Sequence, residues 1–594
     1  MVTEMTKYDF ILMSGDADAF LEKLQSVGVV DITRSMKPVD DKSEKLSARA
    51  EIYRKALLQL KEVEKAEDPG QKPTDFAVEV METVRDKEAI EAQLPQLYRD
   101  VEERKPWGQF DAKSFDFLKE NGLKLHFYKN KTIEPAWKEQ YALSEISKVD
   151  GYSYFVVVSE NDDYDFPLKE LPAPDTDYAA IEKQISDLEA QVKEKDHRLA
   201  QLKWHEPVLQ AELDKTLSKL DLHLAQVAGE RAAEDYITVF EGFAPSVNEP
   251  ALRDMLDKEA VFYVEDKAKV DDNPPIKLKN NKFVSMFELL TDMYGRPKYD
   301  EFDPTVWISI FFMLFFAFCM GDAGYGLVLI IGSLVLKKML GNIAPLGVTL
   351  GIATTIIGVL FHTFFSVDML NWDWIPEVVK KCMLPAKLPF LGSEYDGAMV
   401  LAIIVGVVHI CLAMIVKTYQ STKVKGFANS LGTWGWTLLI VGGVIVLALA
   451  LIGVLENAVA TWAIIIIGIL SALGIFFLNN LHRNPLKNMG AGLWDTYQMV
   501  TGLLGDVLSY LRLYALGLAG AKLGEAFNAI GTQALGDGGI GWVWFILIVL
   551  IGHVLNIAMC ILGAFVHPLR LNFLEFFKNS GYEGTGRKYK PLKT

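Results

Sequence analysis

The chain has few cysteines, and no two of them lie close together in the sequence. The 594 residues include four, scattered through the second half as Cys319, Cys382, Cys411 and Cys560. Neither the short spacing of a thiolate metal site nor the framework of a disulfide-rich fold is present. We therefore expect ordinary packing residues, with no metal and no cofactor bound.

The first residues lack the features of a secretory signal. Met1 to Phe10 contain Glu4, Lys7 and Asp9 and no apolar run, whereas a cleaved signal needs an apolar core. We therefore expect the first domain to stay in the cytoplasm.

A nucleotide-binding loop is also missing. The segment 581–588, GYEGTGRK, resembles a P-loop only superficially, because Arg587 stands where a lysine is needed and no Ser or Thr follows at the metal position. No predicted strand precedes this segment. We expect this chain not to hydrolyse ATP itself, so energy must come from partner subunits, and we expect no nucleic-acid partner.

Charge and hydropathy divide the chain into two unlike halves. Half of all residues are apolar. Residues 305–594 hold 18 Lys or Arg and 13 Asp or Glu, so the first 304 residues hold the remaining 42 and 63. The formal net charge is thus −21 in the first half and +5 in the second. This division predicts an acidic cytoplasmic domain over 1–304 and a membrane domain over 305–594.

The soluble half begins and ends with similar strand–helix–strand patterns. The first pattern lies within residues 8–34 and the second within 236–264. We expect both to complete one α/β lobe next to the membrane, built from 1–40 and 231–270 and followed by a linker at 271–304.

Two long charged helical stretches, 42–106 and 178–230, lie between these patterns. Apolar residues in both follow the spacing of a coiled-coil seam, which Pro207 interrupts in the second stretch. The seam positions are Ile52, Ala56, Leu60, Val63, Val84, Ile90 and Leu94, and then Ile181, Ile185, Leu188, Val192, Leu199, Leu202, Leu209, Leu213, Leu217 and Leu220. We expect an antiparallel coiled coil with a second α/β lobe, 107–177, at its far turn. Two solvated helices that never pair are the alternative.

The second half contains eight apolar segments, each about long enough to cross a bilayer. They lie near 305–320, 323–336, 343–365, 398–416, 431–454, 460–478, 494–530 and 541–577. We therefore expect an α-helical, multi-pass membrane protein with about eight transmembrane helices. An even number of crossings would leave both termini in the cytoplasm, with a short cytoplasmic tail.

The basic residues support this orientation. The predicted inner loops and the tail carry Lys337, Lys338, Lys417, Lys423, Lys425, Arg483, Lys487, Lys578, Arg587, Lys588 and Lys590. The predicted outer loops 455–459 and 531–540 carry no Lys or Arg. The loop 367–397 breaks the pattern with three lysines, and its Trp372 and Trp374 suggest a helix lying at the outer interface.

An arginine in the middle of a membrane helix costs about 2.5–3.5 kcal/mol on insertion scales, so Arg512 needs a reason. Its helix face otherwise holds mostly small or polar residues: Asp495, Gln498, Gly502, Gly505, Ser509, Leu516 and Ala519. Such a face lets another helix approach closely, and a lone cation on it would attract that helix's carboxylate. Pairing with a fixed carboxylate is the structural alternative, although Asp506 lies about 240° round the helix from Arg512.

A second arginine lies on a polar stripe of the last apolar segment. The stripe comprises His553, Asn556, Cys560, Gly563, His567 and Arg570, and Pro568 is positioned to kink the helix. The histidines could relay protons, although buried histidines that only satisfy hydrogen bonds are commoner. Asp506, Glu525 and Glu575 are further candidates for aqueous entry and exit paths.

Several segments resemble one known family along almost the whole chain. Residues 509–519, SYLRLYALGLA, are similar to the family's SYLRL-x-AL-x-LA helix, and residues 567–575, HPLRLNFLE, resemble its second arginine helix, R-L-x-x-x-E. The family's membrane entry resembles 274–281 (PPIKLKNN), 293–299 (MYGRPKY), 302–305 (FDPT) and 321–326 (GDAGYG). Together these motifs make the chain similar to the a/I subunit of vacuolar-type and archaeal-type rotary ATPases.

The resemblance implies a stator subunit that conducts H⁺ or Na⁺ and is not catalytic by itself. Arg512 and Arg570 would face a rotating ring of c/K subunits, each bearing a glutamate. The candidates for half-channel residues are Asp495, Gln498, Asp506, Ser509, Glu525, His553, Asn556, His567 and Glu575. E/G-type peripheral-stalk subunits, a d/C-type central-stalk subunit and the lipid bilayer would be the other partners. Gly520 stands where eukaryotic members commonly have a histidine, which favours a prokaryotic-type enzyme in a cell membrane.

Two other functions fit parts of the pattern. A secondary transporter with a cytoplasmic regulatory domain would also bury arginines, but inverted repeats with broken helices, which would favour it, are not visible in the sequence. A coiled-coil membrane scaffold without a transport role would leave both arginines and the polar stripe unexplained. The sequence therefore favours the rotary stator.

Overall fold

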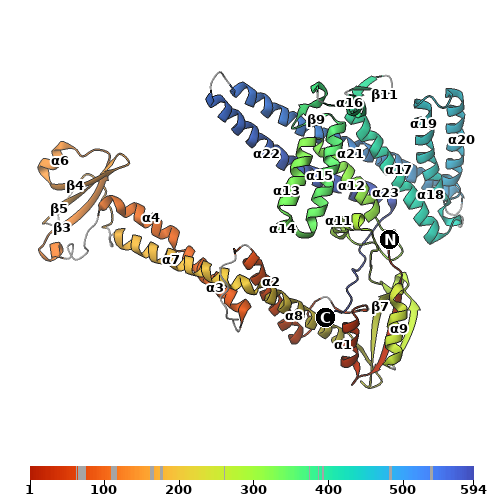
Figure 1. Cartoon of the computed structure of the whole chain (residues 1–594), viewed down its shortest axis with the longest axis horizontal. Helices are drawn as coiled ribbons and strands as arrows, with labels where there is room; N and C mark the ends of the chain where they lie inside the picture. The colour runs from red at the N-terminus through yellow and green to blue at the C-terminus, as the bar shows by residue number, and fades with distance from the viewer. Residues whose placement is uncertain are drawn as a thin grey trace. The chain divides into compact units, whose positions relative to one another are not determined.

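The computed structural model describes most of the chain, and the described residues are mostly helical (Figure 1). They are 1–35, 37–61, 63–64, 75–108, 117–160, 166–173, 178–259, 261–373, 375–385, 387–390, 393–479, 485–535 and 539–593. The expectations for Trp374 and Arg483 lie outside this set. The chain forms two compact units. One unit comprises Met1–Ile11, Val29–Asp31 and Glu241–Pro591, and the other comprises Leu12–Gly28, Ile32–Phe240 and Leu592–Thr594.

The helices of the two charged stretches pack against each other. The first stretch forms α2 (Asp41–Lys61), α3 (Phe76–Glu91) and α4 (Leu94–Arg104), and the second forms α7 (Tyr178–Leu202) and α8 (Glu206–Val227). Helix α2 packs on α8, and α3 and α4 pack on α7. Because predicted seam residues such as Leu60, Leu199 and Leu202 are buried in their shared core, the alternative of two helices that never pair is wrong. Ile52, also predicted in the seam, is 40% exposed, and regular coiled-coil geometry remains a prediction.

Two small sheets accompany these helices. One is antiparallel, in the order β3 (Lys124–Asn130), β5 (Tyr152–Ser159), β4 (Ala142–Val149). The other has the order β2-β7-β1-β8, with β6 added on β7. Its strands are β1 (Met5–Met13), β2 (Asp31–Ile32), β6 (Glu230–Ala232), β7 (Ile237–Pro245) and β8 (Phe262–Lys267). Both patterns that the sequence predicted for one lobe therefore contribute strands to the same sheet, and they also supply α1 (Ala17–Val27) and α9 (Glu249–Lys258). The exact lobe and domain boundaries remain predictions.

All eight predicted apolar segments contain helices, but among the described residues only five helices are long and apolar enough to span a membrane. The spans are 397–425, 428–451, 457–476, 486–534 and 540–580. They belong to α17 (Gly397–Lys425), α18 (Leu431–Thr437) with α19 (Gly443–Leu451), α20 (Asn457–Phe476), α21 (Pro485–Ala534) and α22 (Gly539–Arg570). The last span continues through a π-helical turn, η9 (Leu571–Phe576), and α23 (Phe577–Ser580). Eight crossings therefore remain a prediction.

The other three apolar segments form short helices. Helices α12 (Thr305–Met320) and α13 (Ala323–Val335) meet at 120°, so this pair forms at most one broken span, and α15 (Ala344–Leu360) has 17 residues. A helix needs about 20 residues to cross about 30 Å at 1.5 Å per residue. The bend was not expected from the sequence, and the described residues contain no second bent pair that would make it a repeat. Beyond α15, a hairpin is formed by β9 (Thr363–Phe364) and β10 (Val367–Asp368). The predicted interfacial segment, 367–397, also contains α16 (Glu377–Cys382) and a second hairpin of β11 (Lys387–Phe390) and β12 (Ser393–Asp396).

Asp322 fixes the bend between α12 and α13. Its carboxylate accepts the N–H groups of Gly324 at 2.8 Å and Tyr325 at 3.1 Å, and so caps the first turn of α13. The same carboxylate accepts the N–H groups of Phe365 at 2.9 Å and Ser366 at 2.6 Å. Because both of these residues have positive φ, the carboxylate also holds a strained turn in the β9–β10 hairpin. The bend thereby places Tyr325 inside the helical bundle, where it is 1% exposed.

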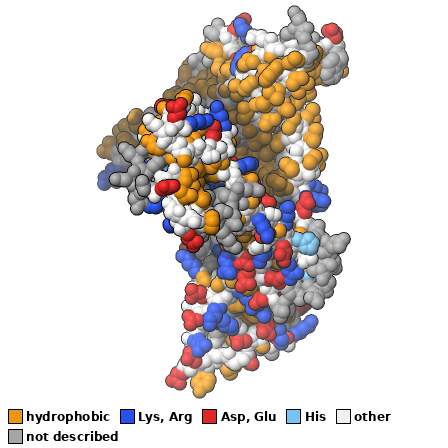
Figure 2. Space-filling view, turned by 90° about the vertical axis from the view of Figure 1, so that its left-hand side faces the viewer, with side chains coloured by type: hydrophobic (Ala, Val, Ile, Leu, Met, Phe, Trp, Pro, Cys, Tyr) orange, Lys and Arg blue, Asp and Glu red, His pale blue; other side chains and the backbone are white. Residues whose placement is uncertain are grey.

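The helices of the second half expose large apolar side chains. Figure 2 shows a broad apolar area on one face of the molecule and a separate area where acidic and basic side chains are mixed. The exposed apolar residues include Ile466 on α20, Leu493 and Leu504 on α21, and Leu550 and Met559 on α22. Apolar area of this extent is not stable in water. The chain is therefore a membrane protein.

Candidate functional site

Helices α21 and α22 carry all the predicted site residues except Glu575, which lies on η9, and they pack along each other (Figure 1). Small residues permit this close approach. A Cβ added at Gly520 of α21 would lie 2.7 Å from Sγ of Cys560 on α22. The carbonyl oxygen of Gly520 also accepts a hydrogen bond from Nδ2 of Asn556 at 2.8 Å. A side chain at position 520 would therefore force the Cys560 side chain to move.

Arg512 lies half-buried on α21 and has no carboxylate partner among the described residues. Its Nη1 is buried without a hydrogen-bond acceptor. Asp506 is used elsewhere, because its carboxylate accepts hydrogen bonds from Nδ2 of Asn579 at 2.7 Å and Nζ of Lys578 at 3.3 Å. His567 lies within electrostatic reach of Arg512. Within the described part of the chain, the structural alternative of a fixed carboxylate partner for Arg512 is therefore not found.

Arg570 is exposed at the end of α22, where the helix changes its winding. The π-helical turn η9 begins at the next residue, and Pro568 lies in the last turn of α22. Single π-helical turns inside helices are frequent at functional sites. His567 lies within electrostatic reach of Arg570 as well, and its Nδ1 is buried without a partner among the described residues. Two arginines and an incompletely bonded histidine thus gather at one level of the helix pair.

A cluster of polar residues lies toward the start of α21 from Arg512. This Asp506 cluster comprises Asp506, Ser509, Glu575, Lys578 and Asn579. Glu575 is 4% exposed, and its Oε2 lacks a partner among the described residues. Ser509 lies beside this carboxyl group, and its hydroxyl donates to the Gly505 carbonyl at 3.0 Å. Six residues of helix separate Asp506 from Arg512, which is about 9 Å along the axis. A buried carboxyl group with one free oxygen can accept or release a cation.

A second cluster lies on the other side of Arg512. This His553 cluster comprises Tyr325, Gly520, Asn528, His553 and Asn556. His553 contacts the Tyr325 hydroxyl through Nδ1 at 2.7 Å and Oδ1 of Asn528 through Nε2 at 3.0 Å. Nδ2 of Asn556 donates to Tyr325 at 2.8 Å and to the Gly520 carbonyl. Both ring nitrogens of His553 are bonded, which is the commoner, structural use of a buried histidine.

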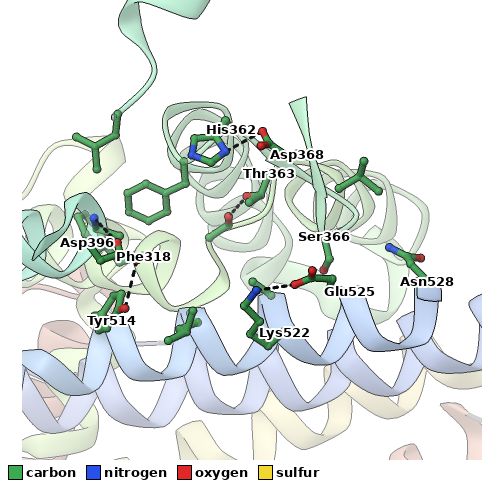
Figure 3. Close-up of a pocket in the computed structure, with 18 of the residues that line it drawn as sticks. Phe318, His362, Thr363, Ser366, Asp368, Asp396, Tyr514, Lys522, Glu525 and Asn528 are labelled. Carbon is green, nitrogen blue, oxygen red and sulfur yellow. Dashed lines mark hydrogen bonds and ion pairs between the residues drawn. The ribbon is translucent and has the colours of Figure 1, made fainter. Parts of the chain in front are cut away.

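A cavity of about 710 Å³ adjoins the His553 cluster through Asn528 (Figure 3). Tyr514, Lys522, Glu525 and Asn528 project into it from α21, while residues of the β9–β10 hairpin line the opposite side. The ionisable groups that line it form a short series of pairs: Nζ of Lys522 lies 2.7 Å from Glu525, Nδ1 of His362 lies 3.0 Å from Asp368, and the Tyr514 hydroxyl donates to Asp396 at 3.3 Å. Three carboxylates face one lysine, so the cavity favours cations.

Two predicted residues lie apart from both clusters. Asp495 accepts a hydrogen bond from Nδ2 of Asn479 at 3.4 Å, and Gln498 is exposed. Asp495 precedes Arg512 by 17 residues, or about 25 Å of helix. Glu525 follows Arg512 by about 20 Å on the same helix. The predicted site residues therefore form a line along α21 and α22.

Sequence reasoning missed several residues that complete these groups. They are Tyr325, His362, Asp368, Asp396, His409, Lys522, Asn528, Lys578 and Asn579. Tyr325 lies in the GDAGYG motif, and His409 is a polar residue within the apolar segment 398–416. His409 contacts the Tyr510 hydroxyl at 2.9 Å and stacks on Phe576 at 4.7 Å. A search for polar residues within apolar segments would have found His409, Asn528 and Lys522.

The chain matches known proteins, and the family match includes both arginines. A model of the V-type ATPase 116 kDa subunit family matches residues 231–344 and 494–594. A-type ATP synthase subunit I of Methanocaldococcus jannaschii is 30% identical over 493 residues, which cover 77% of this chain and 68% of that protein. V-type ATP synthase subunit I 1 of Treponema pallidum is 25% identical over the whole length of both chains, and A-type ATP synthase subunit I of Pyrococcus abyssi is 31% identical over 54% of this chain and 48% of its own. These matches and the long apolar helices show that the chain belongs to the V-type ATPase 116 kDa subunit family and is a membrane subunit of a rotary ATPase.

Proposed function

We propose that this chain is the ion-conducting stator of a rotary V/A-type ATPase, with Arg512 and Arg570 facing a ring of c/K subunits. The observation that carries the proposal is the guanidinium of Arg512, which is held on a membrane helix without a carboxylate partner among the described residues. An unpaired cation in an apolar environment is costly. A carboxylate supplied by another subunit would remove that cost each time it passed.

The electrostatics of this encounter give the direction of ion release. An arginine within about 4–6 Å of a carboxyl group favours the charged carboxylate. A ring carboxyl group that reaches Arg512 therefore gives up its H⁺ or Na⁺. Once the ring turns away, the carboxylate regains its affinity and reloads. Arg512 and Arg570 together would prevent a loaded carboxylate from passing and so separate the two access paths. Hydrolysis or synthesis of ATP takes place in partner subunits.

The two polar regions on either side of Arg512 supply the half-channels in this proposal. The cavity, with Glu525 at its edge and Asn528 leading to His553 and Asn556, forms the outer path. The Asp506 cluster, with Ser509 and Glu575, forms the inner path, and Asp495 and Gln498 lie farther toward its entrance. His567 lies between the two paths, beside both arginines. In this proposal the two paths do not meet, so an ion crosses only while it is bound to the ring.

The soluble half would connect this motor to the rest of the complex. Its helices and small sheets offer surfaces for E/G-type peripheral-stalk subunits, and a d/C-type central-stalk subunit would be a further partner. Such attachments resist the torque that the ring exerts on α21 and α22. In this proposal the chain crosses the membrane several times, and both termini are cytoplasmic.

The test is ATP-driven uptake of H⁺ and of Na⁺ into membrane vesicles that carry Arg512→Ala, with assembly of the complex measured in the same sample. We expect an assembled complex whose uptake falls below about a tenth of the wild-type rate, since ion release loses its driving charge. Arg54→Ala, which removes an exposed arginine of α2, is the matched control and should pump normally. An assembled Arg512→Ala complex that pumps at the wild-type rate would refute the proposal.

A further inference from the structure

The glycine-rich tail that follows the last membrane helix binds its own chain. Residues 581–590 come directly after α23, which continues the span that carries Arg570. Within this unit the tail contacts the linker 274–301 and the segment 29–31 through both its backbone and its side chains. The glycine-rich sequence of this tail, which resembles a phosphate-binding loop, thus serves contacts within the chain.

The tail forms an anion-binding nest that the carboxylate of Glu301 fills. The N–H of Glu583 donates to Oε1 of Glu301 at 2.8 Å, and the N–H of Gly584 donates to Oε2 at 3.1 Å. Gly584 and Thr585 both have positive φ, near 75°, which lets consecutive N–H groups curl toward one anion. A P-loop uses the same device for phosphate. Here the anion belongs to the chain itself.

Beyond the nest, the backbone of the tail continues along the linker. The N–H of Gly586 donates to the Arg296 carbonyl at 2.9 Å, and the N–H of Tyr589 donates to the Ile276 carbonyl at 3.2 Å. The N–H of Lys590 donates to Oδ2 of Asp31 at 2.9 Å. A Cβ at Gly586 would lie 2.0 Å from the carbonyl oxygen of Pro297. Only glycine therefore fits at position 586.

Side chains reinforce the same path. The Tyr582 hydroxyl donates to the Gly295 carbonyl at 2.6 Å, and this tyrosine is 4% exposed. Nζ of Lys588 lies 3.1 Å from the carboxylate of Asp292. Lys298 and Glu583 form a further ion pair. Charged and backbone contacts thus follow one another along the tail from residue 582 to residue 590.

The attachment joins the end of the last apolar helix to the start of the first. Glu301 lies four residues before Thr305, where α12 begins, and it also accepts the N–H of Lys298 at 2.8 Å. The Arg570 end of α22 lies one π-helical turn and one short helix before the tail. We propose that the attached tail 581–590, which we call the strap, positions Arg570, with Glu301 and Gly586 as positioning residues. The two arginines would then hold a fixed spacing while the ring exerts torque. This inference rests on the proposed function, in which Arg570 faces the ring.

Loss of the strap should cause slip, which means ATP hydrolysis without the matching ion transport. Displacement of a functional group by about 1 Å is enough to impair its action. The experiment measures cation uptake per ATP hydrolysed in vesicles containing the purified complex with Glu301→Ala or Gly586→Ala. We expect both variants to hydrolyse ATP and to lose about threefold or more in this ratio. Glu301→Gln, which keeps an acceptor oxygen, should recover part of the ratio.

Two matched controls separate the strap from general damage. Asp300→Ala removes the same charge one residue earlier, and Gly15→Ala adds a methyl group where nothing lies within 4 Å. Both should keep the wild-type ratio. Hydrogen exchange of the amides of 583–590 reports whether the strap has opened, and it can be read even in a variant that assembles poorly.

The outcomes distinguish this inference from the proposed function. A Glu301→Ala complex with fast-exchanging tail amides and the wild-type ratio would overturn the positioning role, and so would tail amides that stay protected in that variant. If Arg512→Ala abolishes uptake while both strap variants keep their ratio, only the strap inference fails. If Arg512→Ala pumps normally, the proposed function fails first.

Discussion

The surroundings of His553 and of Arg512 differ although both residues lie on apolar helices of one membrane bundle. His553 is fully bonded, through Tyr325 and Asn528, and Asn556 joins the same network. Arg512 and His567 each keep a buried nitrogen without a partner among the described residues. Selection for stability alone would remove a buried polar group that lacks a hydrogen-bond partner, since such a group costs about 1–3 kcal/mol of folding free energy. Within the proposed function, the bonded His553 cluster therefore forms a fixed wall of the outer path, while Arg512 and His567 interact with a group from another subunit.

The largest effect on stability should come from the most completely bonded polar group, Asp322. Asp322→Ala would leave four N–H groups without their acceptor at the α12–α13 bend. We expect a loss of about 3–4 kcal/mol, because buried donors without partners pay their full desolvation cost. Thermal denaturation of the purified complex checks this. A loss below about 1 kcal/mol would mean that the bend does not depend on the carboxylate.

Replacing each of the two histidines of α22 with phenylalanine, one at a time, tests this comparison directly. His553→Phe leaves the Tyr325 hydroxyl and the Asn528 carbonyl each short of a partner, and we expect about 1–2 kcal/mol of destabilisation. His567→Phe breaks no hydrogen bond at Nδ1, so we expect less than about 0.5 kcal/mol. Transport should show the reverse order, with roughly a tenfold loss for His567→Phe.

These variants need thermal denaturation and vesicle uptake on the same preparations. The comparison breaks if His567→Phe is the more destabilising of the two, because His567 would then be a structural residue. It also breaks if His553→Phe stops transport without loss of stability, since His553 would then act as a relay.

Periodicity predicted the helices well and predicted their partners poorly. Seam residues such as Leu199 and Leu202 are buried, and Arg512 lies within a long apolar helix, because both features depend on spacing along one helix. The bond between Tyr325 and His553 joins residues 228 positions apart, which no local pattern encodes. The sequence did not predict the 120° bend, because two short apolar segments resemble two separate crossings. The bend depends on Asp322, whose carboxylate accepts hydrogen bonds both from the first turn of α13 and from the β9–β10 hairpin.

The glycine-rich tail teaches a related lesson about motifs. Its glycines correctly indicated backbone that approaches an anion closely, but the sequence could not say which anion. The carboxylate of Glu301 lies more than 280 positions away in sequence and close in space. A motif therefore predicts a local geometry, and the ligand depends on the tertiary fold.

The smallest expected effect concerns a paired carboxylate outside the membrane helices, which contrasts with the unpaired groups around Arg512. Burial raises the pKa of Asp292, but the hydrogen bonds and charges of Arg296 and Lys588 outweigh it and hold the pKa below its ordinary value. A lowered pKa in the folded state means that the contribution to stability is present above the unfolded pKa of about 3.9 and is lost as the pH falls through the folded value. The strap should therefore not respond to pH between about 5 and 8.

Hydrogen exchange of residues 586–590, corrected for the intrinsic effect of pH, measures this independence. We expect constant protection between about pH 5 and 8, and a decline that begins only below about pH 4. Asp292→Asn removes one of the carboxylates that hold the tail, so it should reduce the low-pH decline and lower protection modestly at every pH. Glu301 and Asp31 keep their contacts with the tail in this variant. A decline centred near pH 6.5 would instead point to a histidine, and it would show that the Asp292–Lys588 pair does not control this part of the tail.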